Sequence, residues 1–159
     1  MTTASPIIER TDSLGAAKRL LTQHEPEAAR RLLAGLSNRS PEESNMLGVA
    51  LMRSGRFREA VALFRGLIYS SGSVVATQDF PVYFKLNFAS ALLGDGNLEG
   101  FLNFLMETPR ESHPEAERLW ASYDAWLQNM GFASKLLWRM GLHQPQKLPA
   151  VPSPPGAVE

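Results

Sequence analysis

The stretch ALMRSGRFREAVALFRGL, residues 50–67, decides the fold of this chain. Its apolar residues follow a helical spacing on both sides of Gly55, and glycine is the residue that most often ends a helix. The stretch therefore predicts one helix that ends near Ser54 and a second, amphipathic helix that begins near Phe57. Two helices joined by so short a turn pack against each other and run in opposite directions.

The same pattern recurs elsewhere in the chain. Residues 19–36 and residues 91–108 both align with residues 50–67 without a gap, and a weaker match lies around residues 131–140. In each copy the second helix carries one apolar stripe with a period near 3.6 residues. The four stripes are residues 29, 32, 33 and 36; 57, 60, 61 and 64; 98, 101, 102 and 105; and 133, 136, 137 and 140. Such recurrence indicates a solenoid of helix pairs, in which no unit can bury its apolar face alone.

Local signals place the helix ends. Ser40-Pro41-Glu42-Glu43 has the pattern of a capping box with proline at the first helical position, and His113-Pro114-Glu115 opens another helix. The β-branched cluster at residues 72–77 is interpreted as a loop. The predicted fold class is all-α, a short α-solenoid (superhelix) of antiparallel helix pairs. About eight helices are expected, near residues 12–23, 26–36, 41–54, 57–70, 81–94, 97–107, 114–130 and 132–141.

Composition is typical of a globular domain and excludes several classes of function. The 159 residues are 44% apolar and 20% charged, with a formal net charge of zero, which gives no electrostatic reason for binding nucleic acid. The chain has no cysteine, so disulfides and thiolate chemistry are excluded. No secretory signal precedes residue 10, and no apolar run reaches the roughly 18 residues needed to span a bilayer. We therefore expect a cytoplasmic protein that binds neither membranes nor nucleic acid.

The chain is expected to form one domain with two simpler ends. Residues 1–8 are predicted to be flexible, residues 9–143 to form the helical repeat domain, and residues 144–159 to form a disordered, proline-rich tail with little apolar material to bury. Removal of this tail is expected to leave stability unchanged. Two alternatives for the tail stay open, namely a recruitment motif and a segment that lies in the groove of its own domain. The repeat units are expected near residues 9–36, 41–70, 82–108 and 114–142.

The best-defined repeat resembles a known family. Leu47-Gly48 followed by Leu51, Gly55, Phe57, Ala60 and Phe64 is similar to the tetratricopeptide (TPR) signature, in which small residues lie where helices cross and aromatic residues space them. The match is good for residues 41–68, fair for 9–36 and 83–108, and suggestive for 117–142. The resemblance implies a right-handed stack whose first helices line a concave groove that binds peptides or partner proteins.

That resemblance in turn implies a set of groove residues. They are the first-helix residues that point away from the core stripe. The predicted partner-binding residues are Asn45, Val49, Met52, Arg53, Tyr83, Leu86, Asn87, Ser90 and Leu93. Leu86 and Leu93 could equally pack against the next helix. The set suits an amphipathic helix or an extended segment with at least one acidic residue better than a carboxyl terminus. Trp126 lies off the apolar stripe of its helix, so it is the best candidate for an exposed anchor.

The leading functional hypothesis is a non-enzymatic protein–protein interaction module, an adaptor or scaffold that binds a peptide or helix of a partner protein. The alternative is a structural module that forms homo-oligomers through its solenoid faces. We expect no catalytic residue, no metal and no cofactor, because the chain has no nucleophile–base pair, phosphate-binding loop or cofactor fingerprint. Its three histidines, His24, His113 and His143, are isolated in the sequence.

Overall fold

The computed structural model describes residues 6–69, 80–142 and 147–158, and all regular structure within these ranges is helical. The helices are α1 (Pro6–Thr22), α2 (Pro26–Ala34), α3 (Pro41–Arg53), α4 (Phe57–Ile68), α5 (Val82–Gly94), α6 (Leu98–Met106), the short 3-10 helix η1 (Arg110–Ser112), α7 (Pro114–Asn129) and α8 (Phe132–Arg139). The expected all-α class and the expected helices are confirmed within a few residues at each end. One difference is that α1 begins at Pro6, so residues 6–8 are helical rather than flexible. The expected loop at residues 72–77 and the flexible residues 1–5 lie outside the described residues.

The turns inside the first three helix pairs are built in the same way. The second residue after the end of the first helix adopts a left-handed backbone conformation, at His24 (φ 61°), Gly55 (φ 74°) and Gly96 (φ 86°). In each turn the following backbone N–H donates to the carbonyl five residues earlier, as Arg56 does to Leu51 at 2.9 Å. This arrangement satisfies carbonyls that the helix end would leave unpaired. The structural repeat therefore has the same spacing as the sequence repeat.

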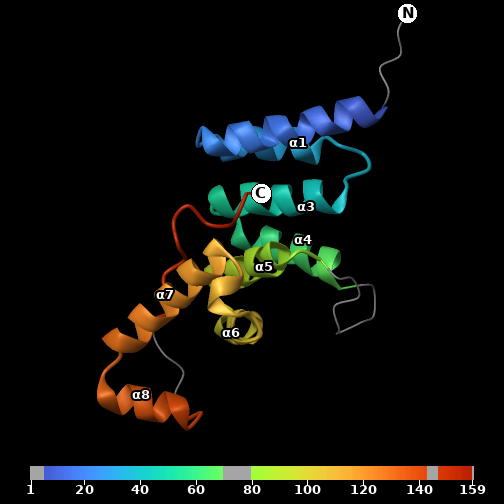
Figure 1. Cartoon of the computed structure of the whole chain (residues 1–159). Coiled ribbons are helices and arrows are strands. Elements are labelled where there is room, and N and C mark those ends of the chain that lie inside the picture. Colours follow the sequence, from blue (N-terminus) through green and yellow to red (C-terminus); the bar gives the residue numbers. More distant parts are fainter. Residues whose placement is uncertain (1–5, 70–79, 143–146, 159) are drawn as a thin grey trace, which may run out of the picture.

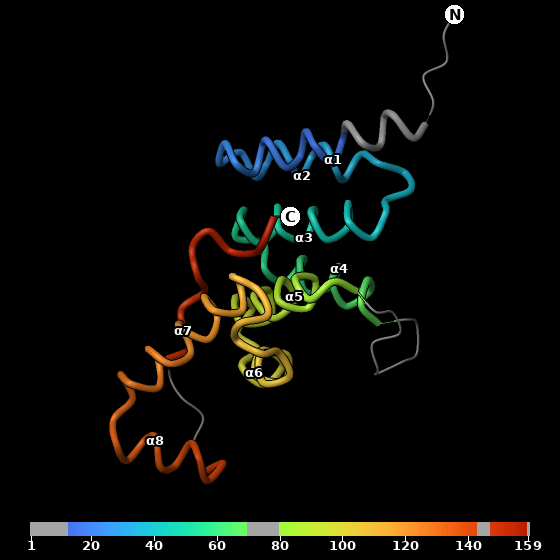
Figure 2. Tube along the Cα trace, in the orientation of Figure 1, coloured from blue at the N-terminus to red at the C-terminus, as the bar shows by residue number. Residues whose placement is uncertain are grey.

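The helices follow one another in order along an elongated molecule (Figure 1). Each helix from α1 to α6 packs on the next one in the chain, and the first helices of neighbouring pairs also touch, α1 with α3, α3 with α5 and α5 with α7. The trace in Figure 2 shows α1 and α2 at one end and α8 at the other. The first helices thus form a continuous row along the molecule.

Small residues allow the helices to approach closely. A Cβ atom added at Gly48 of α3 would lie 2.3 Å from the Cζ atom of Phe64 on α4, and one added at Gly94 of α5 would lie 2.2 Å from the ring of Phe57. Ala60 is fully buried on the same face of α4 as Phe64. Each of these glycines therefore has the ring of a neighbouring helix directly against its backbone, which leaves no room for a side chain.

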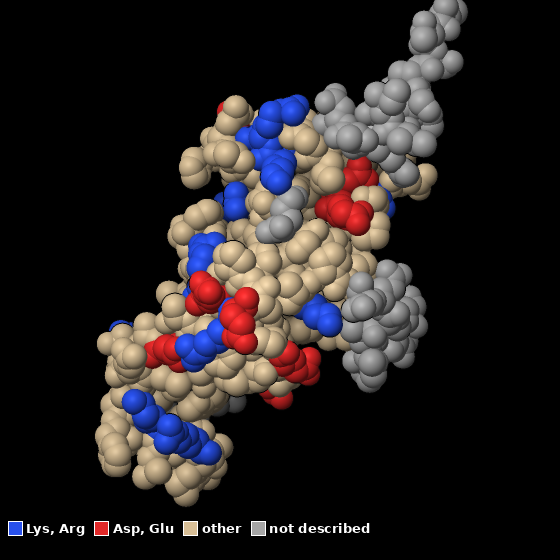
Figure 3. All heavy atoms as spheres, in the orientation of Figure 1, with Lys and Arg blue, Asp and Glu red and all other residues tan. Residues whose placement is uncertain are grey.

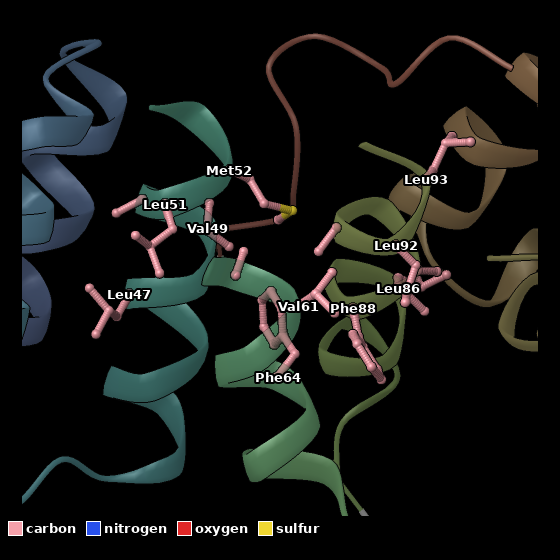
Figure 4. Packing of buried hydrophobic residues seen from close by; sticks show 14 of the residues in the cluster. Leu47, Val49, Leu51, Met52, Val61, Phe64, Leu86, Phe88, Leu92 and Leu93 are labelled. Atoms are coloured by element: carbon pink, nitrogen blue, oxygen red, sulfur yellow. The ribbon is translucent and has the colours of Figure 1, made fainter. Parts of the chain in front are cut away.

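The apolar stripes of the first three pairs form one hydrophobic core, and Figure 4 shows its central part between α3, α4 and α5. The stripe expected on the fourth pair is different. Leu136 and Leu137 of α8 are 49% and 40% exposed, and Met140, directly after the helix, is 60% exposed. Helix α8 contacts the rest of the fold mainly through Trp138, whose ring meets that of Trp126 edge-on at 5.6 Å. The interpretation of residues 133–140 as a core stripe is therefore wrong, because no further helix covers that face among the described residues.

The surface carries no large field of a single sign on the side seen in Figure 3, where Lys and Arg side chains alternate with Asp and Glu among mostly uncharged residues. None of the helices in the described ranges combines the length and the apolar character that crossing a bilayer requires. The same residues contain no group of three or more His, Asp or Glu side chains placed to hold a metal ion.

Candidate functional site

The polypeptide that follows α8 returns to the row of first helices. We call residues 147–158 the tail segment. Figures 1 and 2 show it running from α7 to the middle of α3, where the described chain ends. The prediction of a disordered tail is thus wrong for residues 147–158, because side chains of three helices bind the backbone of this segment. The open alternative, a segment lying in the groove of its own domain, fits this finding. Residues 144–146 and 159 lie outside the described residues.

Gly156 is the most deeply placed residue at the end of the tail segment. It is buried, and a Cβ atom added to it would lie 2.7 Å from Cε of Met52, 3.1 Å from Cγ2 of Val49 and 3.3 Å from Oδ1 of Asn87. Figure 4 shows the Met52 side chain reaching the tail segment. The φ angle of Gly156, 81°, also lies in the region that only glycine adopts without strain. Gly156 therefore fits between α3 and α5 because it lacks a side chain.

Asn87 of α5 binds the next residue through both of its amide atoms. Its Nδ2 donates to the carbonyl oxygen of Ala157 at 3.2 Å, and its Oδ1 accepts from the N–H of Ala157 at 2.7 Å. Nδ2 also donates to Oδ1 of Asn45 at 3.1 Å. Both asparagines are buried, and the contact with Asn45 fixes the orientation of the Asn87 amide. Asn87 thus presents one donor and one acceptor to the backbone of a single residue, Ala157.

Arg53 at the end of α3 connects three carbonyl oxygens. Its Nε donates to Pro155 at 3.1 Å, and its two terminal nitrogens donate to Gly156 at 3.0 Å and to Leu21 of α1 at 3.2 Å. Burial lowers the pKa of the Arg53 guanidinium from its usual high value, and the group remains charged at neutral pH. A half-buried guanidinium that donates to several carbonyl oxygens fixes the position of the polypeptide backbone.

Helix α7 supplies contacts along the rest of the tail segment. Arg118 donates to the carbonyl of Pro154 at 2.9 Å, the hydroxyl of Ser122 donates to the carbonyl of Ala150, and Nε1 of Trp126 donates to the carbonyl of Lys147 at 2.6 Å. These three donors lie four residues apart on α7, so they share one side of the helix. The tail segment therefore runs along that side of α7, in the opposite chain direction.

Glu115, at the start of α7, is a buried carboxylate beside Gly156. Its oxygens accept from Arg118 at 2.7 Å and from the hydroxyl of Ser90 at 3.4 Å, and the backbone of Gly156 also hydrogen-bonds to it. Burial raises the pKa of Glu115, and the charge of Arg118 and these hydrogen bonds oppose that rise. The carboxylate thus depends on the tail segment for one of its partners.

We call the side chains that contact residues 154–157 the tail-binding face. They are Val49, Met52 and Arg53 of α3, Asn87 of α5, and Glu115 and Arg118 of α7. Asn45 and Ser90 lie directly behind it.

The other predicted groove residues lie elsewhere. Leu86 is fully buried and Leu93 is 2% exposed, both within the hydrophobic core, which agrees with the alternative that these two leucines pack between helices. Tyr83 is half-buried, with its ring edge-on to Phe84 at 4.9 Å and near His113 at 6.1 Å. On α5, the tail-binding face therefore includes fewer residues than the predicted groove.

Sequence reasoning missed the contribution of α7, apart from one residue. Trp126 was predicted to be an exposed anchor because it lies off the apolar stripe. In the structure it is half-buried between Tyr123 and Trp138, and it binds the tail segment. Glu115 and Arg118 carried no comparable signal, because acidic and basic residues at these positions are common on any helix.

We find no match to this chain among protein-family models, curated proteins or solved structures. The functional argument consequently rests on the residues of the tail-binding face and their geometry.

Proposed function

We propose that this chain is a TPR-like interaction module, a short α-solenoid whose tail-binding face holds an extended segment of a partner protein. Three features support the solenoid interpretation, namely the repeated left-handed turns, the small residues at the helix crossings and the row of touching first helices. The tail-binding face is formed by the first helices α3, α5 and α7, and partner binding by first helices is what the TPR resemblance implies.

One observation carries the proposal. Polar side chains of the tail-binding face bind the backbone of four consecutive residues, 154–157, and not their side chains. A segment without its own sheet or helix partners must find hydrogen bonds for its carbonyl and N–H groups elsewhere. Arg53, Asn87 and Arg118 supply them to residues 154–157, which bend at Gly156 and form no regular secondary structure, so the face is suited to binding a polypeptide backbone.

The kind of partner follows from the same contacts. Arg53 uses its donors on carbonyl oxygens, so the face does not need an acidic side chain in the partner, which the sequence had suggested. An amphipathic helix is also a poorer fit than an extended segment, because its carbonyls are already paired within the helix. The proposed partner is therefore a protein with an exposed stretch that has no regular secondary structure.

The test uses a fluorescent peptide with the sequence of residues 147–158, KLPAVPSPPGAV. It is titrated into the full chain carrying Gly156→Val, which releases the chain's own tail segment, and binding is followed by fluorescence anisotropy. We expect saturable binding that weakens at least about tenfold when Arg53→Gln is added, because two charge-assisted hydrogen bonds are lost.

Arg58→Gln is the matched control, since the Arg58 side chain is 91% exposed and pairs only loosely with Asp95 at 3.5 Å. It should leave the affinity unchanged. Equal binding by the Arg53→Gln and Arg58→Gln proteins, with normal melting curves, would contradict the proposal.

A second candidate function, self-association, is favoured by helix α8. Phe132, Met140 and Leu142 at this end of the molecule are 84%, 60% and 67% exposed, which is unusual for large apolar side chains that lie close together in the chain. Light scattering coupled to size exclusion tests this function. A concentration-dependent dimer that Phe132→Glu abolishes would support it, and a monomer at all concentrations would exclude it.

A further inference from the structure

We propose that the tail segment is a built-in competitor for the tail-binding face, and that the partner segment which displaces it carries a glycine at the position of Gly156. This inference rests on the proposed function, because it concerns the regulation and the specificity of the same face. On this proposal the partner is a segment without regular secondary structure that places a glycine between α3 and α5.

The tail segment is held like a ligand. Ser153 and Pro154 are exposed, Pro155 and Ala157 are half-buried, and deep burial in this half of the segment is confined to Gly156. The hydrogen bonds around it come from side chains and not from secondary structure. Elsewhere in the segment Pro149 is buried, and Val151 and Val158 pack against the hydrophobic core. The segment nevertheless buries fewer apolar side chains than a core helix such as α5, so it opens at a lower free-energy cost than the helical core. It can therefore leave the face while the helices stay folded.

The glycine requirement comes from two independent features. The φ of 81° at Gly156 would strain any residue with a Cβ atom. In addition, that atom would lie closer to Met52 and Val49 than ordinary contact allows. A glycine followed by a small residue, as in Gly156-Ala157, is thus the pattern that this face recognises.

Attachment gives the tail segment an advantage over a free competitor. A tethered segment acts at an effective concentration on the order of millimolar, so a free peptide of identical sequence must compete against it. If the free peptide binds the open face at about 10–100 μM, tethering weakens its apparent affinity about 10- to 100-fold. Release of the tail segment should strengthen the apparent affinity of the free peptide by the same factor.

The experiment compares three full-length proteins with the fluorescent 147–158 peptide. They are the wild type, Gly156→Val and Ser153→Val, the last of which places the same side chain at an exposed position of the same segment. We expect Gly156→Val to bind the peptide about 10- to 100-fold more tightly than the wild type, and Ser153→Val to behave as the wild type. A peptide that itself carries Gly156→Val should not bind to any of the three proteins.

A second measurement does not depend on the variant protein. Hydrogen exchange of residues 147–158 in the wild type should accelerate when excess unlabelled peptide is added, and should not accelerate with the valine-containing peptide. Equal affinity of the peptide for wild type and Gly156→Val, without accelerated exchange, would overturn the competition but leave the proposed function intact. Absence of binding to every protein would overturn the proposed function itself. Tight binding of the valine-containing peptide would overturn the glycine requirement.

Discussion

At the scale of single residues, the fold depends on pairs in which a small residue of one helix accepts a large residue of another. Gly48 lies against the ring of Phe64, and Ala60 lies one turn away from that ring on the same helix. Because the ring fills the whole space above Gly48, both the small and the large member of the pair are constrained.

The first prediction concerns this crossing. Ala60→Leu should lower the free energy of unfolding by about 1–3 kcal/mol through overpacking, and Phe64→Ala should lower it by about 3–5 kcal/mol through a cavity. Chemical denaturation monitored by circular dichroism measures both. Ala62→Leu, at an exposed position of the same helix, is the control and should cost little. A similar loss for Ala60→Leu and Ala62→Leu would refute the assigned crossing.

The second prediction concerns the buried carboxylate of Glu115. Because burial raises its pKa in the folded protein, the stability that this group contributes is fully present below the pKa of the unfolded chain and is lost as pH rises through the folded value. Glu115→Gln cannot titrate and keeps an acceptor for the backbone of Gly156. We therefore expect its stability, relative to wild type, to increase as pH rises from about 4 to about 6.

Urea denaturation of both proteins across this range measures the difference. A relative stability of Glu115→Gln that falls as pH rises would mean that Arg118 and the hydrogen bonds outweigh burial, and that the pKa of Glu115 is lowered instead.

At the scale of elements, the helices were predictable and the tail segment was not. Helix bounds follow from local signals such as the capping box at Ser40, where the hydroxyl accepts from Glu43 N–H at 3.2 Å and the Glu43 carboxylate accepts from Ser40 N–H at 2.7 Å. The tail segment is placed by contacts such as that between Arg53 and Gly156, which are 103 residues apart. A backbone contact of this kind leaves no pattern in the sequence of the tail.

The candidate site was predictable to a similar degree. The TPR resemblance, combined with helical periodicity, implied Asn45, Val49, Met52 and Arg53 on one side of α3, and Val49, Met52 and Arg53 contact the tail segment in the structure. The same reasoning could not separate Leu86, which packs in the hydrophobic core, from Asn87, which binds the tail segment, because both are fully buried on a first helix that also packs against its neighbours.

The third prediction concerns the tail as an element. Removal of residues 144–159 should lower the free energy of unfolding by about 1–3 kcal/mol, because Val49 and Met52 become exposed and the hydrogen bonds to Arg53, Asn87 and Glu115 are lost. Thermal denaturation should show a decrease of several degrees with unchanged helicity. An unchanged melting temperature would instead support the tail without fixed structure that its composition suggests.

At the scale of the whole molecule, the tail-binding face and the exposed apolar side chains of the last helix pair lie apart. The tail segment covers the row of first helices from α3 across α5 to α7, whereas α8 leaves apolar side chains exposed at one end of the molecule. The proposed peptide binding and the second candidate function, self-association, therefore involve separate parts of the molecule. A variant of one part should leave the other function intact.

The fourth prediction follows from this separation. The side chain of Phe132 on α8 is 84% exposed. Phe132→Glu should not change the affinity of the Gly156→Val protein for the 147–158 peptide, even if the substitution abolishes a dimer. Anisotropy titration of the double variant measures this affinity. A large loss of affinity would show that the two surfaces are coupled or that binding requires a dimer.

The account depends on the backbone of residues 154–157 being held by the tail-binding face, and the exchange rate of the Ala157 amide proton tests this most directly. Its N–H donates to Oδ1 of Asn87 at 2.7 Å, so hydrogen exchange followed by NMR should show protection in the wild type. Asn87→Ala should remove that protection, whereas Asn103→Ala, at an exposed position of α6, should retain it. Exchange of the Ala157 amide at the rate of an unstructured peptide in the wild-type protein would contradict the account.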